Sequence, residues 1–191
     1  MNSDEILQLF KDSSALLNGH FKLTSGRHSN VYYEKFTLLK QPKICTKICQ
    51  QMADHFKDSA PQTIVGPTTG GIIIAYDVAR YMCIDSIYAE AGDEGGRVFK
   101  RGFSLEKGEK VVIVDDVLTT GRSIFEVIDL VKKYEAEIVG ISLMLDRSNG
   151  AVKFDYPFYA LTTVDAESWE QEDCPLCANG EEITQRGSRK F

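Results

Sequence analysis

Two adjacent acids, Asp115 and Asp116, lie between an apolar run, Val111-Val-Ile-Val114, and the segment Thr119-Thr-Gly-Arg-Ser123. The run predicts a strand buried on both faces, and the segment after the acids predicts a loop that opens a helix. The free N–H groups of a helix N-terminus attract an anion, and the three hydroxyls of this segment add donors. Because carboxylates repel a phosphate, the acids need another partner, and the two hydroxyl donors of a cis-diol suit them. A phosphate beside a diol describes ribose 5-phosphate.

The complete pattern of apolar strand, Asp-Asp, Thr-Thr-Gly and Ser resembles the signature with which type I phosphoribosyltransferases bind 5-phosphoribosyl 1-diphosphate (PRPP). Two plainer interpretations compete, since acid pairs at strand ends also hold Mg²⁺ in other folds and Thr-Gly turns occur without a ligand. The resemblance implies that the two acids are catalytic, binding the ribose hydroxyls and stabilising positive charge on the ring. It implies PRPP contacts at Asp115, Asp116, Val117, Leu118, Thr119, Thr120, Gly121, Arg122 and Ser123.

Further segments are similar to one branch of that family, the orotate phosphoribosyltransferases, and the similarity spans residues 19–190. Leu23-Thr-Ser-Gly-Arg-His-Ser-Asn-Val-Tyr32 resembles their N-terminal hood. The turn Gly66-Pro-Thr-Thr-Gly-Gly71 is similar to their diphosphate loop, which implies PRPP contacts at Thr68, Thr69, Gly70 and Gly71. Leu145-Asp-Arg-Ser148 resembles the segment that supplies a ligand to the orotate carboxylate, and Cys174-Pro-Leu-Cys177 with Gly187-Ser-Arg189 resembles the tail of a bacterial and archaeal subgroup.

The resemblance implies an enzyme of pyrimidine synthesis that converts orotate and PRPP to orotidine 5′-monophosphate and diphosphate. Orotate would contact Thr119, Arg147 and Tyr33, although Arg147 also suits a surface salt bridge and Tyr33 ordinary strand packing. Mg²⁺ would be held mainly through the diphosphate, so we expect no metal ligands from the protein. A homodimer in which a loop of one subunit serves the other subunit's site is also implied.

One segment departs from the family pattern. The mobile loop of better-known members carries a Lys and a His, whereas here Tyr88-Ala-Glu-Ala-Gly-Asp-Glu-Gly-Gly96 is shorter and acidic. A departing diphosphate needs compensating cations, and the nearest are Arg97, Lys100 and Arg101. We expect Lys100 to bind PRPP and Arg101 to act as a catalytic cation, across a dimer interface.

The elements that must position these residues follow from hydrophobic periodicity. Strands are predicted at 63–65, 86–89, 110–114, 138–145 and 158–164, and helices at 2–18, from 42, at 72–83 and at 121–134. Asn2 would cap the first helix, residues 20–33 would form a hairpin, and residues 98–105 would form a short hairpin arm. Alternating strands and helices indicate parallel pairing with right-handed crossovers.

The expected fold is therefore α/β, a type I phosphoribosyltransferase fold with a central, mainly parallel sheet flanked by helices and a small N-terminal hood. We expect one domain over residues 1–191. Residues 1–40 would form the N-terminal helix and hood, 60–165 the α/β core, and 166–191 a loose C-terminal tail.

Composition narrows the functional classes. The chain has 191 residues, of which 43% are hydrophobic and 26% charged, with a net charge of −6. No stretch approaches the ~20 uncharged apolar residues of a membrane helix, and the acidic, amphipathic N-terminus is unlike a signal or transit peptide. We therefore expect a cytoplasmic enzyme with no membrane or nucleic-acid partner. The alternatives are a phosphoribosyltransferase for another base and a PRPP-sensing regulator, and the acidic balance argues against the second.

The five cysteines predict reduced thiols. Cys174 and Cys177 are half of a zinc site, which needs four ligands. A closed site would then need two subunits or Cys45, Cys49 and Cys83, so a purely structural tail is favoured, with a shared metal as the minor alternative. His20, His28 and His55 lack metal-ligand spacing, and His28 is interpreted as a hood residue. Cys45 and Cys49, four residues apart, predict core packing on a helix.

Overall fold

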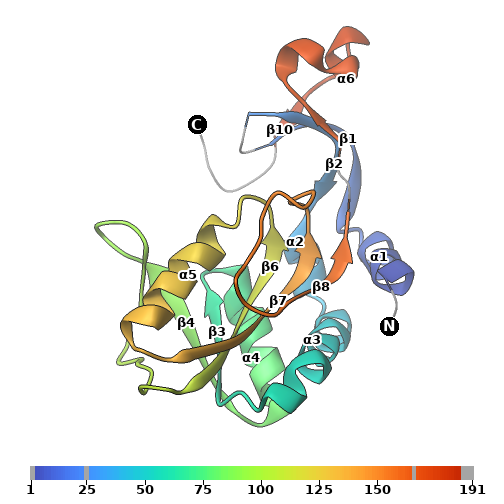
Figure 1. Ribbon diagram of the computed structural model, residues 1–191. Helices are drawn as coiled ribbons and strands as arrows, with labels where there is room; N and C mark the ends of the chain where they lie inside the picture. Colours follow the sequence, from blue (N-terminus) through green and yellow to red (C-terminus); the bar gives the residue numbers. More distant parts are fainter. Residues whose placement is uncertain (1–2, 24–25, 165–166, 186–191) are drawn as a thin grey trace.

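The computed structural model describes residues 3–23, 26–164 and 167–185, which form two sheets (Figure 1). The larger sheet has six strands in the order β5-β4-β3-β6-β7-β8. All neighbouring pairs are parallel except β4 and β5. Its strands are β3 (Thr63–Pro67), β4 (Asp85–Ala91), β5 (Arg97–Val98), β6 (Lys110–Leu118), β7 (Glu137–Asp146) and β8 (Phe158–Thr163). The expected mainly parallel α/β sheet is confirmed.

Helices cover both faces of this sheet, and the alternation of side chains along β6 shows why. Val112 and Val114 pack in one apolar cluster with α3 (Pro42–Phe56) and α4 (Gly70–Met82). Val111 and Ile113 point the other way and pack with α5 (Arg122–Lys133). The apolar β-branched run therefore lies in the middle of a three-layer core, as a strand buried on both faces requires.

The N-terminal segment differs from its prediction. α1 (Ser3–Asp12) ends well before residue 18, and Leu16–Lys22 is strand β1. Two residues after the helix, Ser14 has a left-handed φ of 55°. The N–H of Ala15 donates to the carbonyl of Phe10 at 2.9 Å, which closes a Schellman motif. Leu16 and Leu17 thus continue the apolar pattern in a strand, and the predicted cap Asn2 lies outside the described residues.

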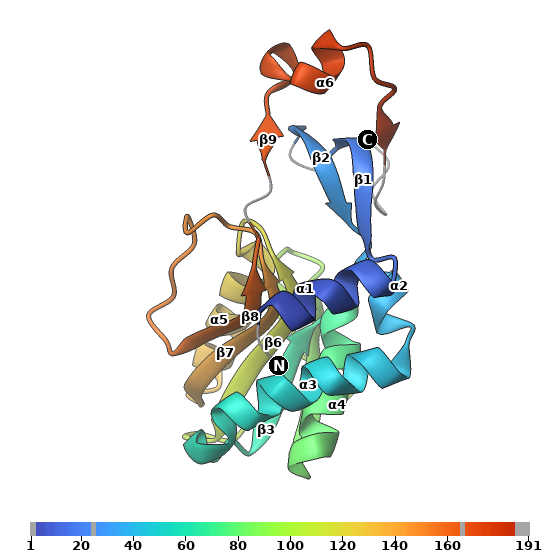
Figure 2. The same cartoon turned by 90° about the vertical axis from the view of Figure 1, so that its right-hand side faces the viewer.

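A second, four-stranded sheet in the order β10-β1-β2-β9 forms the hood. It comprises β1 and the antiparallel β2 (His28–Tyr33), flanked by β9 (Ser168–Trp169) and β10 (Thr184–Gln185). The hood stands beyond the end of the core toward which β6 and β8 point (Figures 1 and 2). The expected hairpin at 20–33 is therefore present. Two residues of the hood motif, 24 and 25, lie outside the described part of the chain.

The C-terminal segment corrects the expectation of a loose tail. Residues 167–185 add both edge strands to the hood and carry η2 (Gln171–Asp173) and α6 (Pro175–Ala178) between them. Arg27 fastens this segment to the hairpin, since its Nε donates to Ser168 Oγ at 3.0 Å and its guanidinium pairs with Glu170. The hood is thus built from both ends of the chain. Residues 187–189 lie outside the description.

Two shorter helices, α2 (Lys35–Leu39) and η1 (Lys57–Ser59), complete the described elements. The arm expected at 98–105 is not a hairpin, because β5 pairs instead with β4. Among the described residues, no helix is both long and apolar enough to cross a membrane.

Candidate active site

The two acids lie near the carboxyl end of β6, in the part of the strand that pairs with β7. Only 7% of Asp115 and 2% of Asp116 is exposed. Asp115 accepts hydrogen bonds from the Asp116 N–H at 2.8 Å and from the Ser123 hydroxyl at 3.0 Å. Asp116 accepts the N–H of Val117 at 2.7 Å. Both carboxylates are therefore held in fixed orientations at the place where parallel sheets bind ligands.

The electrostatic balance of this pair favours a hydrogen-bond donor. Burial, and secondarily the neighbouring Asp116 carboxylate, raise the pKa of Asp115 to about 7. Hydrogen bonds from Asp116 N–H and Ser123, together with the Lys35 charge, oppose the shift. A ligand that brings hydroxyl donors or positive charge would relieve the repulsion, whereas a bare anion would increase it.

Lys35, at the start of α2, is a site residue that the sequence reasoning missed. Its Nζ lies 2.9 Å from Asp116 Oδ1 and 2.8 Å from Oδ2. The hood strand β2 ends two residues earlier, at Tyr33, so the hood delivers this cation to the acid pair. No local pattern marks Lys35 in the sequence, because the contact joins residues 81 positions apart.

The loop after the acids joins β6 to α5 as predicted. Thr119 and Thr120 are exposed, and Gly121 precedes the helix with a left-handed φ of 74°. A Cβ at Gly121 would lie 2.9 Å from both Phe125 and Val152, so the tight entry into α5 requires glycine there. The exposed threonines and the first turn of α5 leave donors available for a phosphate.

Leu118, at the end of β6, and Arg122, at the start of α5, each have a hydrogen-bond partner within the chain. The Leu118 side chain is 1% exposed and packs in the core, and its carbonyl accepts the N–H of Arg147 at 2.9 Å. The guanidinium of Arg122 pairs with Glu126 at 2.8 Å along the exposed face of α5. Val117 is partly buried and packs at the edge of the core.

A second turn, residues 68–71, packs directly on the acids from β3 and α4. A Cβ at Gly70 would lie 1.8 Å from Asp116 Oδ2, and one at Gly71 would lie 3.3 Å from Asp115 Oδ1. The peptide between Thr68 and Thr69 is cis. The two predicted loops therefore lie beside the acid pair, and the two glycines are what allow the close approach.

Of the three cations near the acidic segment, Arg97 is the one that reaches this turn. Its Nη1 donates to Thr68 Oγ1 at 2.8 Å and its Nε lies 3.4 Å from Glu126. Lys100 lies 3.8 Å from Asp93, and Arg101 pairs with Glu90 at 3.0 Å with 63% of its side chain exposed. Within the described part of this single chain, Lys100 and Arg101 pair with these acidic residues and do not reach Asp115 or Asp116 of their own subunit.

Arg147 and Tyr33 form a second pair of side chains near the carboxyl end of β6, where the N–H of Arg147 donates to the carbonyl of Leu118. The Arg147 Cζ lies 4.9 Å from the centre of the Tyr33 ring, a cation–π contact. Burial lowers the pKa of Arg147 and raises the pKa of Tyr33. Arg147 Nε is buried and makes no hydrogen bond among the described residues. A partly buried guanidinium with an unused donor suits a carboxylate, while the Tyr33 ring also makes a T-shaped contact with the Phe10 ring.

Comparisons with known proteins identify relatives of this chain. The family model described as "Phosphoribosyl transferase domain" matches residues 37–176. The orotate phosphoribosyltransferase of Caldicellulosiruptor bescii is 44% identical over 190 residues, covering 100% of both chains. That of Chlorobaculum parvum is 43% identical over 189 residues, covering 99% of this chain and 97% of the relative.

Solved structures give the same fold. Leishmania donovani UMP synthase superposes with a TM-score of 0.72 at 26% identity, covering 85% of this chain and 36% of that one. The orotate phosphoribosyltransferase of Aeropyrum pernix has a TM-score of 0.67 at 23% identity, covering 83% and 93% of the two chains. At this identity the second likeness concerns the fold alone.

Proposed function

This chain belongs to the phosphoribosyl transferase family and, within it, to the orotate phosphoribosyltransferases, and from that premise we propose how its residues carry out the reaction. Orotate N1 attacks C1 of the PRPP ribose, the bond from C1 to the diphosphate oxygen breaks, and orotidine 5′-monophosphate and diphosphate leave. The reaction belongs to pyrimidine biosynthesis. Deprotonated N1 is itself nucleophilic, so the protein's task is to position the substrates and stabilise charge.

The observation that carries the proposal is a buried acid pair between two turns suited to anions. Asp115 and Asp116 would accept the ribose hydroxyls and stabilise positive charge as the C1–O bond breaks. The start of α5, with Thr119 to Ser123, would bind the 5-phosphate, and Thr68 to Gly71 would cradle the diphosphate. The raised pKa of Asp115 supports hydroxyl donors as the natural partners. Lys35 would leave Asp116 or share it when ribose enters.

Selection of the base would depend on the residues between the acid pair and the hood. Arg147 would grip the orotate carboxylate, with Tyr33 beside it and Thr119 near the ring. The buried, unused Nε of Arg147 among the described residues supports this role. A purine offers no carboxylate, so an adenine-type specificity would leave that guanidinium without a partner.

The diphosphate end requires positive charge. Mg²⁺ would bind chiefly through the diphosphate oxygens, where it neutralises the leaving group. The fit is favourable, because the acids are already engaged by Lys35, Ser123 and backbone N–H groups and the ion need not take them as its main ligands. Arg97 would support the Thr68 turn within its own subunit. We further propose a cytoplasmic homodimer in which Arg101, and with it Lys100, serves the neighbouring site.

The specificity is tested by initial rates of diphosphate release from PRPP and Mg²⁺ with orotate, uracil, adenine and hypoxanthine in parallel. We expect orotate to be preferred by at least ~10-fold, the value of one charge-assisted contact. Equal rates with orotate and uracil would show that the orotate carboxylate is not recognised. A preference for adenine or hypoxanthine would contradict the proposed function.

A further inference from the structure

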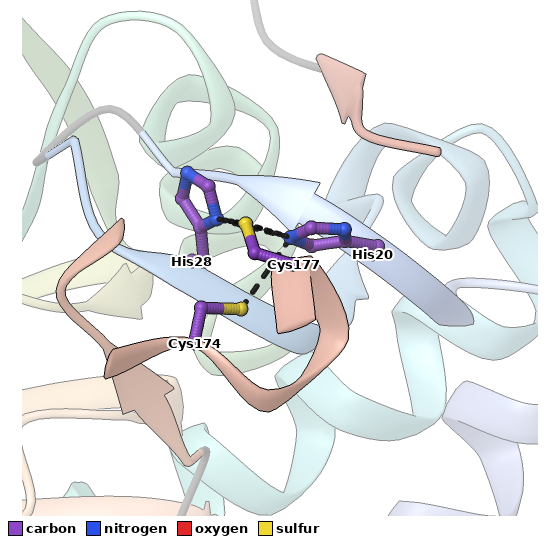
Figure 3. A group of neighbouring side chains, drawn as sticks. All are labelled: His20, His28, Cys174 and Cys177. Atoms are coloured by element: carbon purple, nitrogen blue, oxygen red, sulfur yellow. Dashed lines mark hydrogen bonds between the residues drawn. The ribbon is translucent and has the colours of Figure 1, made fainter. Parts of the chain in front are cut away.

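The interior of the hood holds four side chains that the proposed reaction does not use. His20 comes from β1, His28 from β2, and Cys174 and Cys177 from the segment around α6 (Figure 3). His20, His28 and Cys174 are buried, with 3%, 0% and 2% of each exposed, and Cys177 is partly buried. We propose that these four residues form a structural zinc site within one chain.

The spacing of the ligand atoms matches a tetrahedral zinc. Bond lengths of about 2.3 Å to sulfur and about 2.0–2.1 Å to nitrogen place two nitrogens ~3.3 Å apart and a sulfur and a nitrogen ~3.6 Å apart. His20 Nε2 lies 3.0 Å from His28 Nδ1. The sulfur-to-nitrogen distances are 3.5 Å and 3.7 Å to His20 and 3.3 Å to His28. All four atoms lie within 4.8 Å of one another, so an ion fits with small adjustments.

The donor set and the outer contacts also favour zinc. Two thiolates and two imidazoles form the Cys₂His₂ set of structural zinc sites, whereas Mg²⁺ and Ca²⁺ prefer oxygen. His20 Nδ1 lies 2.9 Å from the carbonyl of Glu181, so its proton belongs on Nδ1 and the lone pair of Nε2 faces the cluster. Such a carbonyl contact is the usual way in which a zinc-bound histidine is oriented.

The elements that the ion would join need such a fastening. β9 and β10 have two residues each and α6 has four, which is too short for any of them to be stable alone. The cysteines lie about 150 positions from the histidines in sequence. One ion would therefore fix the C-terminal segment to the N-terminal hairpin. The same hairpin strand, β2, ends at Tyr33 and is followed by Lys35, so the ion would stabilise the strand that precedes the Lys35–Asp116 contact.

The sequence favoured a purely structural tail and predicted that a closed site would need two subunits or Cys45, Cys49 and Cys83. The structure instead places two histidines of the same chain beside Cys174 and Cys177. The spacing of His20 and His28 along the chain does not indicate a zinc site. The two residues come together only through the antiparallel pairing of β1 and β2. Cys45 and Cys49 instead pack in the core, 3.9 Å apart, as predicted.

The first test is metal content and geometry in the full-length protein, purified under a thiol reductant that excludes a disulfide. We expect about one zinc per chain by elemental analysis. Replacement by Co²⁺ should give the visible bands of a tetrahedral ion together with thiolate-to-metal charge transfer. A chain that remains metal-free after anaerobic incubation with Zn²⁺, or an octahedral Co²⁺ spectrum, would overturn the proposal.

A pair of variants separates the site from general effects on folding. Cys177→Ser should weaken zinc binding by more than the 10–100-fold that loss of an outer-shell contact causes, and should expose the C-terminal segment to proteolysis. Cys83→Ser is the matched control, since Cys83 is exposed and outside the cluster, and it should bind zinc normally. Equal zinc content in both variants would refute the assignment. Because binding is measured directly, this result is independent of orotate turnover.

Discussion

Lys35→Met tests whether the hood controls the charge of the acid pair. The Nζ of Lys35 lies 2.8 Å from the nearer oxygen of Asp116, which corresponds to a gross attraction of ~6 kcal/mol at an effective dielectric of about 20. The Lys35 side chain is 37% exposed and Asp116 only 2%, so solvent screening and desolvation remove most of this energy. We expect a net loss of about 2 kcal/mol in unfolding free energy. In a chain of this size, that lowers Tm by about 4–8 °C.

A double-mutant cycle gives the decisive comparison. Urea unfolding of Lys35→Met, Asp116→Asn and the double variant should yield a coupling energy of about 1–2 kcal/mol. Because the Lys35 charge lowers the pKa of Asp115, Lys35→Met should also raise that pKa above 7, measurable by carboxyl NMR titration. A coupling below about 0.5 kcal/mol together with an unchanged Asp115 pKa would refute the assignment of Lys35 to the site.

Four further variants test the other residues of the proposed site. Arg147→Ala should raise KM for orotate by about 10–100-fold through loss of charge-assisted hydrogen bonds, while KM for PRPP stays nearly constant; equal effects on both would indicate a structural role. Burial raises the pKa of Asp115 from 3.8 to about 7, so the folded state binds an extra proton and its stability should fall as pH rises from about 4 to 7. In urea unfolding at about pH 4 and about pH 7, Asp115→Asn should lose this pH dependence of stability. The same pH dependence in the variant and the unchanged protein would contradict the raised pKa of Asp115. Gly70→Ala should lower kcat sharply in steady-state assays, because its Cβ would displace the Asp116 carboxylate; unchanged turnover would show that the carboxylate position is unimportant. Arg101→Ala should lower turnover, and heterodimers with Asp116→Asn subunits should regain activity only if Arg101 acts on the neighbouring subunit's site.

The core of the fold was predictable because its signals are local. The β-branched run of β6 and the periodicity of α3, α4 and α5 each mark an element without reference to the rest of the chain. The acid pair and its loop were likewise identified as one contiguous motif. The end of α1 was missed because the left-handed residue there is Ser14 rather than a glycine.

The remaining features depend on contacts between distant segments. Lys35 acquires its role only when the start of α2 lies beside Asp116 of β6, and Arg97 only when β5 pairs with β4 beside Thr68. The C-terminal segment has no strand pattern in the sequence, because β9 and β10 are only two residues long. They are ordered by pairing with β2 and β1. No periodicity in the segment itself indicates that pairing.

The proposed reaction transfers the phosphoribosyl group of PRPP to orotate at the Asp115–Asp116 site. Its most direct test is to measure, in one reaction with PRPP and Mg²⁺, both the diphosphate and the orotidine 5′-monophosphate formed by the purified protein and by Asp116→Asn. We predict equal amounts of the two products, formed only when orotate is present, with turnover on the order of 10²-fold lower in the variant. Diphosphate release without orotidine 5′-monophosphate, or full activity in Asp116→Asn, would contradict the account.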